Sequence, residues 1–269
     1  MSHLQSRPIA IIARKLFALF GADYEAFRYQ SFVLQKQCEK FARKIFEPMG
    51  IDYWSKPAIF DMDNKLQKYL SYSNGFFIEA GANNGFDQSN TYYLEKFKNW
   101  QGVLIEPIPE LYEQCVAERT QSRVFNCALV SQDYDQPTLK MKYIGLMSMV
   151  SGLFQDKEKE KVHVEVGVKI QGKLSTYEIE VPARTLTSIL EQVGAENIDF
   201  FSLDVEQFEL EVLKGLDLSR YRPKYFLIET NQKQSIDDYL ENYYVQIDQL
   251  TFHDYLYQRK DDLSDNCPS

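Results

Sequence analysis

The most constraining feature of this sequence is an apolar segment that ends in an acid, followed by a glycine turn, a helical stretch and a second segment of the same kind. Residues 76–79 read Phe-Phe-Ile-Glu, the turn contains Gly81 and Gly85, and residues 102–106 read Gly-Val-Leu-Ile-Glu. In open α/β sheets, this order brings the turn and both acids to the edge where a nucleoside-containing cofactor binds. The sequence therefore predicts an α/β fold with a Rossmann-like sheet and helices on both faces.

The glycine spacing distinguishes between cofactor classes. A dinucleotide fingerprint has three glycines because a pyrophosphate must lie against backbone N–H groups. Here residues 81–85 read Gly-Ala-Asn-Asn-Gly, and the Gly-x-Gly pair is missing. S-adenosylmethionine has no phosphate, and it offers an ammonium group and two ribose hydroxyls to nearby carboxylates. We therefore expect Glu79 at the ammonium group and Glu106 at the ribose, although a glycine turn alone also fits a strand-to-helix connection with no ligand.

A third segment, residues 122–126, ends where the adenine of such a cofactor would lie. Asn126 can pair with the adenine edge, and a strand that simply ends in an asparagine turn explains this residue equally well. The candidate cofactor-binding residues are Glu79, Gly81, Ala82, Asn83, Gly85, Asn90, Glu106, Pro107, Asn126, Cys127 and Asp204.

Two later apolar segments also end in acids. Residues 198–203 are followed by Asp204, and residues 225–228 are followed by Glu229 and, two positions on, Asn231. Because carboxyl ends of neighbouring parallel strands meet at one edge, these three side chains are expected to converge. Their oxygen atoms suit Mg²⁺, which would lower the pKa of an alcohol nucleophile.

The same region contains candidate proton acceptors. Asp204 or Glu206 can take a hydroxyl proton directly, and His253 is a further candidate for the base. The alternatives are that the two acids cap the next helix and that His253 lies on the surface or supports other residues.

Composition narrows the range of partners and compartments. The formal net charge is −9, which argues against a nucleic-acid partner because phosphates need a basic surface. The four cysteines form no Cys-x-x-Cys pair, so we expect free thiols in a reducing cytoplasm. No apolar run approaches the ~18 residues of a transmembrane helix, and no signal peptide is expected.

The chain is expected to have three parts, the second of which contains an insertion. Residues 1–70 show helical periodicity and form an N-terminal extension, which can cover the site as a lid, form a homo-oligomer surface or pack on the sheet. Residues 71–260 form the Rossmann-like domain. Within it, residues 137–182 alternate apolar and polar positions, which predicts an antiparallel β insertion in the substrate wall. Residues 261–269 form a loose tail.

Four motifs together resemble the FkbM-type methyltransferase family over about residues 75–255. They are IEAGANNGFDQSNTYYLE, GVLIEPIPELY, RVFNCALV and LDVEQFELEVLKGL. In the last motif, Gln207 stands where the family usually has glycine, so the local turn is expected to differ.

The resemblance implies a Rossmann-like methyltransferase sheet and S-adenosylmethionine-dependent O-methylation. The acceptor would be a hydroxyl of a sugar, glycan or natural-product scaffold. The alternative is a non-catalytic binding or scaffold protein that retains the fold.

Overall fold

The computed structural model describes residues 38–145, 147–152, 161–162, 164–168 and 176–266. The chain divides into two compact units, Met1–Ser55 and Lys56–Ser269. In the first unit, residues 38–46 are helical and continue into the 3₁₀ helix η2 (Glu47–Met49). Gly50 ends this helix with φ 77°, a left-handed conformation that glycine adopts without strain. The rest of the predicted N-terminal extension, and its proposed lid or oligomer surface, lies outside the described residues.

The predicted boundary near residue 70 is wrong, because the break between the units falls after Ser55. The 3₁₀ helix η3 (Ile59–Asp61) and the helix α3 (Met62–Leu66) belong to the larger unit. Met62, Leu66 and Leu70 are buried in one of its core clusters. Their apolar side chains therefore contribute to the core of the Rossmann-like unit.

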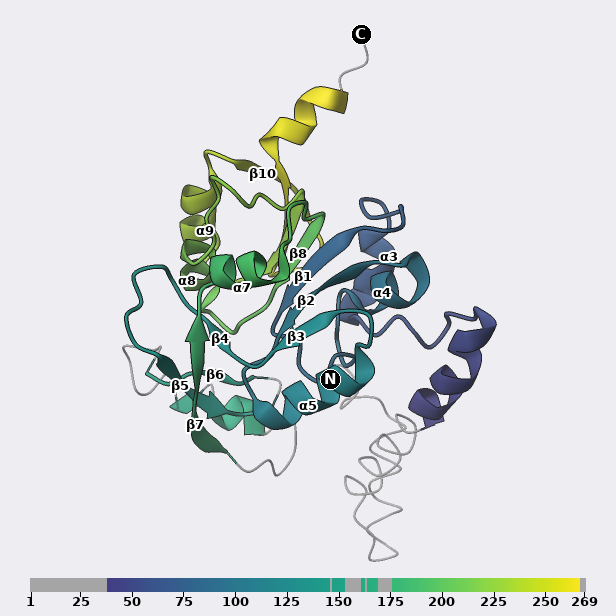
Figure 1. The fold of residues 1–269 in the computed structure, drawn as a ribbon, viewed down its shortest axis with the longest axis horizontal. Coiled ribbons are helices and arrows are strands. Elements are labelled where there is room, and N and C mark those ends of the chain that lie inside the picture. The colour runs from purple at the N-terminus through teal and green to yellow at the C-terminus, as the bar shows by residue number, and fades with distance from the viewer. Residues whose placement is uncertain (1–37, 146, 153–160, 163, 169–175, 267–269) are drawn as a thin grey trace, which may run out of the picture. The chain divides into compact units, whose positions relative to one another are not determined.

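A seven-stranded sheet forms the centre of the larger unit, in the order β10-β11-β9-β8-β1-β2-β3 (Figure 1). Five strands are parallel, namely β1 (Phe76–Ala80), β2 (Gln101–Ile105), β3 (Arg123–Phe125), β8 (Phe200–Leu203) and β9 (Tyr225–Glu229). A closing pair, β10 (Tyr244–Gln249) and β11 (Asp254–Arg259), is antiparallel, and β11 pairs with β9. The strands β2 and β3 lie on one side of β1, and the later strands β8 and β9 lie on its other side. The strand order therefore reverses between β1 and β8.

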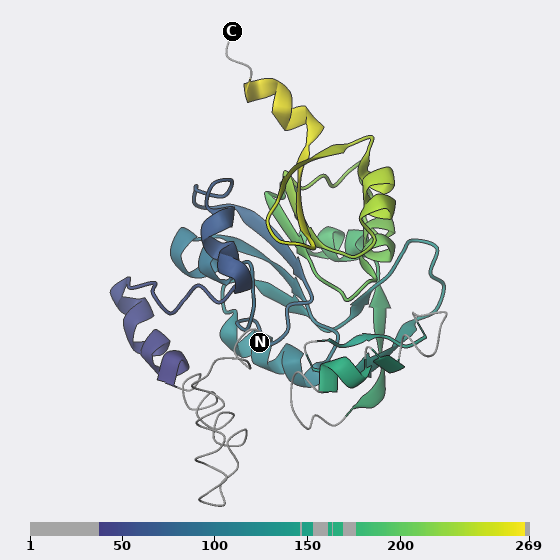
Figure 2. The ribbon, with the colours of Figure 1, turned by 180° about the vertical axis from the view of Figure 1, so that it is seen from behind.

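Helices cover both faces of this sheet, as the views from opposite sides show (Figures 1 and 2). Buried residues of α3, α4 (Tyr92–Lys98) and α5 (Pro109–Glu118) share one core cluster with the sheet. Those of α7 (Leu186–Val193), α8 (Glu209–Lys214) and α9 (Lys233–Leu240) share the other. Along β9, Tyr225 and Leu227 join the first cluster, and Phe226 and Ile228 join the second. This alternation follows from the two-residue repeat of a strand. The predicted fold class is confirmed.

The predicted β insertion forms a second, four-stranded sheet in the order β4-β7-β5-β6. The strands β5 (Thr138–Tyr143), β6 (Met149–Val150) and β7 (Tyr177–Arg184) pair antiparallel. One strand was not predicted, since β4 (Ala128–Leu129) pairs parallel with β7. It links the end of the third sheet strand to the insertion.

The predicted loose tail is wrong for residues 261–266, because η4 (Lys260–Asn266) is a 3₁₀ helix. Ion pairs explain its order. Arg259 contacts Asp262 at 2.8 Å, and Arg222 contacts Asp261 at 2.8 Å. Across the described part of the chain, no helix combines the length and apolar character needed to cross a bilayer.

Candidate functional site

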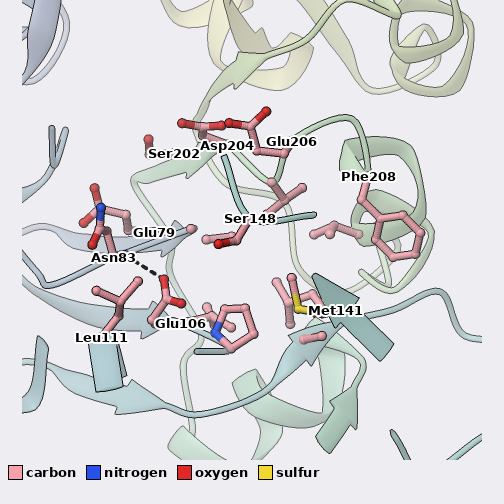
Figure 3. A pocket seen from close by; sticks show the side chains of 18 of the residues that line it. Glu79, Asn83, Glu106, Leu111, Met141, Ser148, Ser202, Asp204, Glu206 and Phe208 are labelled. Atoms are coloured by element: carbon pink, nitrogen blue, oxygen red, sulfur yellow. Dashed lines mark hydrogen bonds between the residues drawn. The ribbon is translucent and has the colours of Figure 1, made fainter. Parts of the chain in front are cut away.

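A cavity opens at the carboxyl ends of β1, β2 and β8, where the strand order reverses. It holds about 1000 Å³ of space that includes open solvent. Sheets of this type bind ligands at such a reversal of strand order. The insertion forms part of the wall through Leu139, Met141 and Val150. Figure 3 shows Glu79, Asn83 and Glu106 on one side of this cavity and Asp204 beside Glu206 on another.

The structure brings together nine of the predicted site residues, which line the cavity: Glu79, Gly81, Asn83, Asn90, Glu106, Pro107, Cys127, Asp204 and Glu206. Six predicted residues are not part of the cavity lining: Ala82, Gly85, Asn126, Glu229, Asn231 and His253.

Glu106 is a buried carboxylate that faces the cavity from the end of β2. Each of its oxygens accepts one backbone N–H, from Asn83 at 2.8 Å and from Ile108 at 2.8 Å. Burial raises its pKa to about 7, and these two hydrogen bonds oppose the shift. Each oxygen keeps acceptor capacity for one further donor, which suits a pair of hydroxyl groups.

Asn126 supports Glu106 from outside the cavity. Its side-chain amide donates to the backbone oxygens of Glu106 and Pro107, each at 2.9 Å. Both amide protons are therefore engaged in fixing the loop after β2. The adenine contact predicted for Asn126 would therefore use its side-chain oxygen, which can still accept a hydrogen bond from the base.

Glu79 is held in a dense network of hydrogen bonds. One oxygen accepts from Asn90 N at 2.9 Å, and the other accepts from Ser89 Oγ, Thr91 Oγ1 and Arg119 Nη1 at 2.9, 2.5 and 3.3 Å. A carboxylate offers about four lone-pair sites. Glu79 thereby orders the loop that forms the cavity rim, and its Oε1, which accepts only from Asn90 N, keeps acceptor capacity for the expected contact with a ligand ammonium.

The two glycines of the turn are required by packing as well as by backbone conformation. Gly81 has φ 83°, and a Cβ there would lie 1.9 Å from the backbone oxygen of Asp204. Gly85 has φ 81°, and a Cβ there would lie 2.8 Å from Arg119 Cγ and 3.0 Å from Cys115 Sγ. Gly81 therefore lets the turn approach β8, and Gly85 lets it pack on α5. Ala82 is buried in the core beside them.

Asp204 and Glu206 form the acidic side of the cavity. Burial, followed by Glu229 and then other nearby carboxylates, raises the pKa of Asp204 well above its usual range. Burial, with Asp204 and Glu209, raises the pKa of Glu206 to about 8. Burial thus favours the protonated form of both carboxyl groups, and a pKa of about 8 places Glu206 close to the range that suits a general base.

Gln207, which stands where the family usually has glycine, has a left-handed backbone conformation. Its φ is 76°, in the left-handed region that glycine favours, and Glu206 before it has φ 52°. Glutamine therefore adopts the conformation that a glycine would take. Backbone contacts support it, since Gln207 N donates to Glu209 Oε1 at 2.7 Å and its oxygen accepts from Gln232 Nε2 at 3.2 Å.

The predicted Mg²⁺ set is not the one that the fold assembles. Glu229 lies within hydrogen-bonding reach of Asp204, but Asn231 is exposed on the loop after β9. The donor atoms that gather near Glu229 come instead from His253 and Asp254, at the start of β11. This grouping arises because β11 pairs antiparallel with β9. The positions of the acids at the ends of the apolar segments did not predict that pairing.

Sequence reasoning missed the apolar and hydroxyl side chains of the cavity and the buried arginine beneath it. Among the missed lining residues are Asp87, Gln88, Ser89, Leu111, Leu139, Met141, Ser148, Val150, Ser202 and Phe208. Asp87 and Ser89 lie in the glycine-turn motif and could have been found there. Arg119, which is 1% exposed, belongs to no motif and gave no signal.

Comparison with known proteins agrees with this architecture. The Methyltransferase FkbM domain family matches residues 79–258. A methyltransferase of Sordaria araneosa, sdnD, is 30% identical over 168 residues, which are 54% of this chain and 61% of that protein. The chain thus spans about three-fifths of the length of this curated relative.

Two solved structures are also similar. A TehB-like SAM-dependent methyltransferase from Corynebacterium glutamicum has a TM-score of 0.39 and 8% identity, covering 84% of this chain and all of that one. A SAM-dependent methyltransferase from Aquifex aeolicus has a TM-score of 0.36 and 11% identity, covering 76% of this chain and 92% of that one. The family match includes Glu79, Glu106 and Asp204, which line the cavity, so the chain belongs to the FkbM methyltransferase domain family.

Proposed function

We propose that this protein transfers a methyl group from S-adenosylmethionine to a hydroxyl oxygen of a small molecule, such as a sugar, glycan or natural-product scaffold. The observation that carries the proposal is the convergence of three strand-end carboxylates, Glu79, Glu106 and Asp204, on one cavity where the strand order reverses. The family membership supports methyl transfer, and the acidic net charge of −9 favours a non-nucleic-acid acceptor.

The donor set fits the proposed cofactor. Glu106 would accept both ribose hydroxyls, because each of its oxygens carries only one hydrogen bond. Asn126 would keep this carboxylate in place through the loop after β2. The ligand ammonium would lie against Glu79 Oε1, which accepts only one hydrogen bond, and near Asp87, which also lines the cavity. When bound, the cofactor supplies an electrophilic methyl group.

The protein's own contribution would be positioning and removal of one proton. Holding acceptor and donor in line replaces a bimolecular encounter with an intramolecular one. The Glu206 carboxylate would accept the hydroxyl proton, because its pKa of about 8 lies near the operating pH. The wall formed by Leu139, Met141 and Val150 would exclude water from this proton transfer.

A binding protein that retains the fold is the second candidate, and product formation separates the two. Mass spectrometry of acceptors incubated with protein and methyl donor would show a gain of one methylene unit for an enzyme and none for a binding protein.

Cys38, Cys115 and Cys127 are unpaired, which supports the further proposal of a reducing, cytoplasmic compartment.

Calorimetry with S-adenosylmethionine and its demethylated product tests the cofactor site. Glu106→Gln removes the charge from one acceptor, so we expect the affinity to fall about 10- to 100-fold, as for a lost hydrogen bond to a charged group. Glu113→Gln, an exposed change on the helix that follows, is the matched control. Equal affinities of the two variants would overturn the ribose assignment.

Turnover tests the proton acceptor separately. Glu206→Gln should lower turnover by about 10²- to 10⁴-fold, with cofactor affinity close to wild type. Asp204→Asn should also lower turnover more than cofactor affinity. If Glu206→Gln turns over at the wild-type rate, Glu206 is not the base.

A further inference from the structure

The end of β9 and the start of β11 bring three metal-ligating side chains together outside the cavity lining. Glu229 and Asp254 are direct cross-strand partners, and His253 precedes Asp254. Thr230 N donates to His253 O at 2.9 Å, which fixes the two strand ends in register. The three side chains therefore meet because of antiparallel pairing between segments that are distant in the sequence.

Among the residues that the structure describes, none is a hydrogen-bond partner of the buried Nε2 atom of His253. Nε2 lies 3.5 Å from Glu229 Oε1 and 3.6 Å from Asp254 Oδ2, and it makes no hydrogen bond to either. These separations exceed the usual 2.7–3.2 Å range for such bonds. A buried polar atom without a partner is costly, and an unseen ion is one of its physical explanations.

The same separations fit a shared cation. Tetrahedral Zn²⁺ has bonds of about 2.0–2.2 Å to nitrogen and oxygen, which places neighbouring donor atoms about 3.4 Å apart. One ligand atom from each of the three residues lies within 4.8 Å of the others. The two carboxylates also face each other across the strands, where like charges repel unless a positive charge lies between them.

We propose that Glu229, His253 and Asp254 form a binding site for a tetrahedral first-row dication such as Zn²⁺. An imidazole with two carboxylates favours such a transition metal over Mg²⁺, which prefers oxygen ligands and octahedral geometry. Neighbouring groups orient the ligands. The Thr251 hydroxyl donates to Asp254 Oδ2, and the Phe252 ring lies 3.8 Å from the imidazole centroid.

This site does not depend on methyl transfer. Glu229 lies within hydrogen-bonding reach of Asp204, so the metal would sit behind the acidic side of the cavity. The remaining tetrahedral position would hold water. The ligand set is complete without any substrate or methyl donor, and it can be tested on the protein alone.

Co²⁺ and Zn²⁺ titrations of the metal-stripped full chain test the proposal. Bound Co²⁺ should give the intense visible absorption of a tetrahedral site, and Zn²⁺ should displace it. At a hundredfold excess over the Kd, Zn²⁺ should raise the Tm by about 5–10 °C. Mg²⁺ at the same concentration should leave the Tm unchanged.

Variants assign the binding to these residues. His253→Gln should weaken Zn²⁺ binding at least tenfold and abolish the Co²⁺ absorption, while Glu211→Gln, an exposed acid on α8, should bind like wild type. Glu229→Gln is the second test if His253→Gln fails to fold without metal. Equal Zn²⁺ affinity of the wild type and a folded ligand variant would overturn the proposal, since a metal held elsewhere would bind both equally. Absence of any Co²⁺ absorption in the wild type would also overturn it.

Discussion

Replacing Arg119 with methionine tests whether a buried charge network supports the cavity rim. The guanidinium is fully buried between two carboxylates, with Nε 3.0 Å from Glu95 Oε2 and Nη1 3.3 Å from Glu79 Oε2. It also donates to Gly85 O at 3.2 Å and to Thr91 Oγ1 at 2.8 Å. Arg119→Met keeps an unbranched apolar chain but leaves both carboxylates without their buried cation.

The expected loss is large because the carboxylates cannot reach water. Side-chain exposure is 0% for Arg119, 0% for Glu95 and 5% for Glu79. Removing one partner of a buried ion pair typically costs about 3–5 kcal/mol. At roughly 2–4 °C per kcal/mol for a chain of this size, the Tm should fall by about 6–20 °C.

An exposed ion pair provides the matched control. Arg220 contacts Glu191 at 2.7 Å, closer than either buried contact, but the two side chains are 57% and 52% exposed. Arg220→Met should therefore cost at most about 1 kcal/mol. Urea unfolding followed by circular dichroism at pH 7 measures both variants.

A double variant separates charge from packing. Adding Glu95→Gln to Arg119→Met removes one of the two buried carboxylate charges that lack Arg119. The double variant should therefore recover at least about 1 kcal/mol of the lost free energy of unfolding, because substitutions at residues in contact are not additive. If Arg119→Met costs no more than Arg220→Met, burial does not govern the strength of this network and the reasoning fails.

Three further predictions concern the backbone and the acidic side of the cavity. Gly81→Ala should lower the free energy of unfolding in urea by about 3 kcal/mol, because its Cβ meets Asp204 O. The control Gly194→Ala, with φ 70° and open space around it, should lower this free energy by only about 1 kcal/mol. Similar losses in the two variants would refute the clash. Gln207→Gly should raise the unfolding free energy by about 1 kcal/mol, because it relieves a left-handed φ of 76° while the backbone hydrogen bonds stay, and an unchanged urea midpoint would contradict this. Burial raises the folded-state pKa of Glu206 to about 8, above its ordinary 4.5, so the folded state binds one more proton than the unfolded state between these values. The free energy of unfolding of the metal-free protein should therefore fall as the pH rises from about 5 to 8. A urea midpoint that rises over this range would show that Glu206 is ionised in the folded protein.

The strands that carry the site, and the edge of the sheet at which it lies, could be predicted from the sequence alone. Apolar runs that end at Glu79, Glu106 and Asp204 became β1, β2 and β8, and all three acids line one cavity. Such predictions succeed because strand formation depends on local periodicity, and because parallel strands carry their ends to the same edge.

Only the tertiary structure decided what each acid does. Arg119, forty positions from Glu79, donates to the same oxygen of that carboxylate as the hydroxyls of Ser89 and Thr91, and no sequence motif indicates this contact. His253 joins Glu229 because β11 returns antiparallel to β9, a pairing set by register across the sheet. Hydrophobic periodicity is a property of residues that are close in the sequence. Desolvation and charge pairing depend instead on neighbours that are distant in the sequence and that only folding brings together.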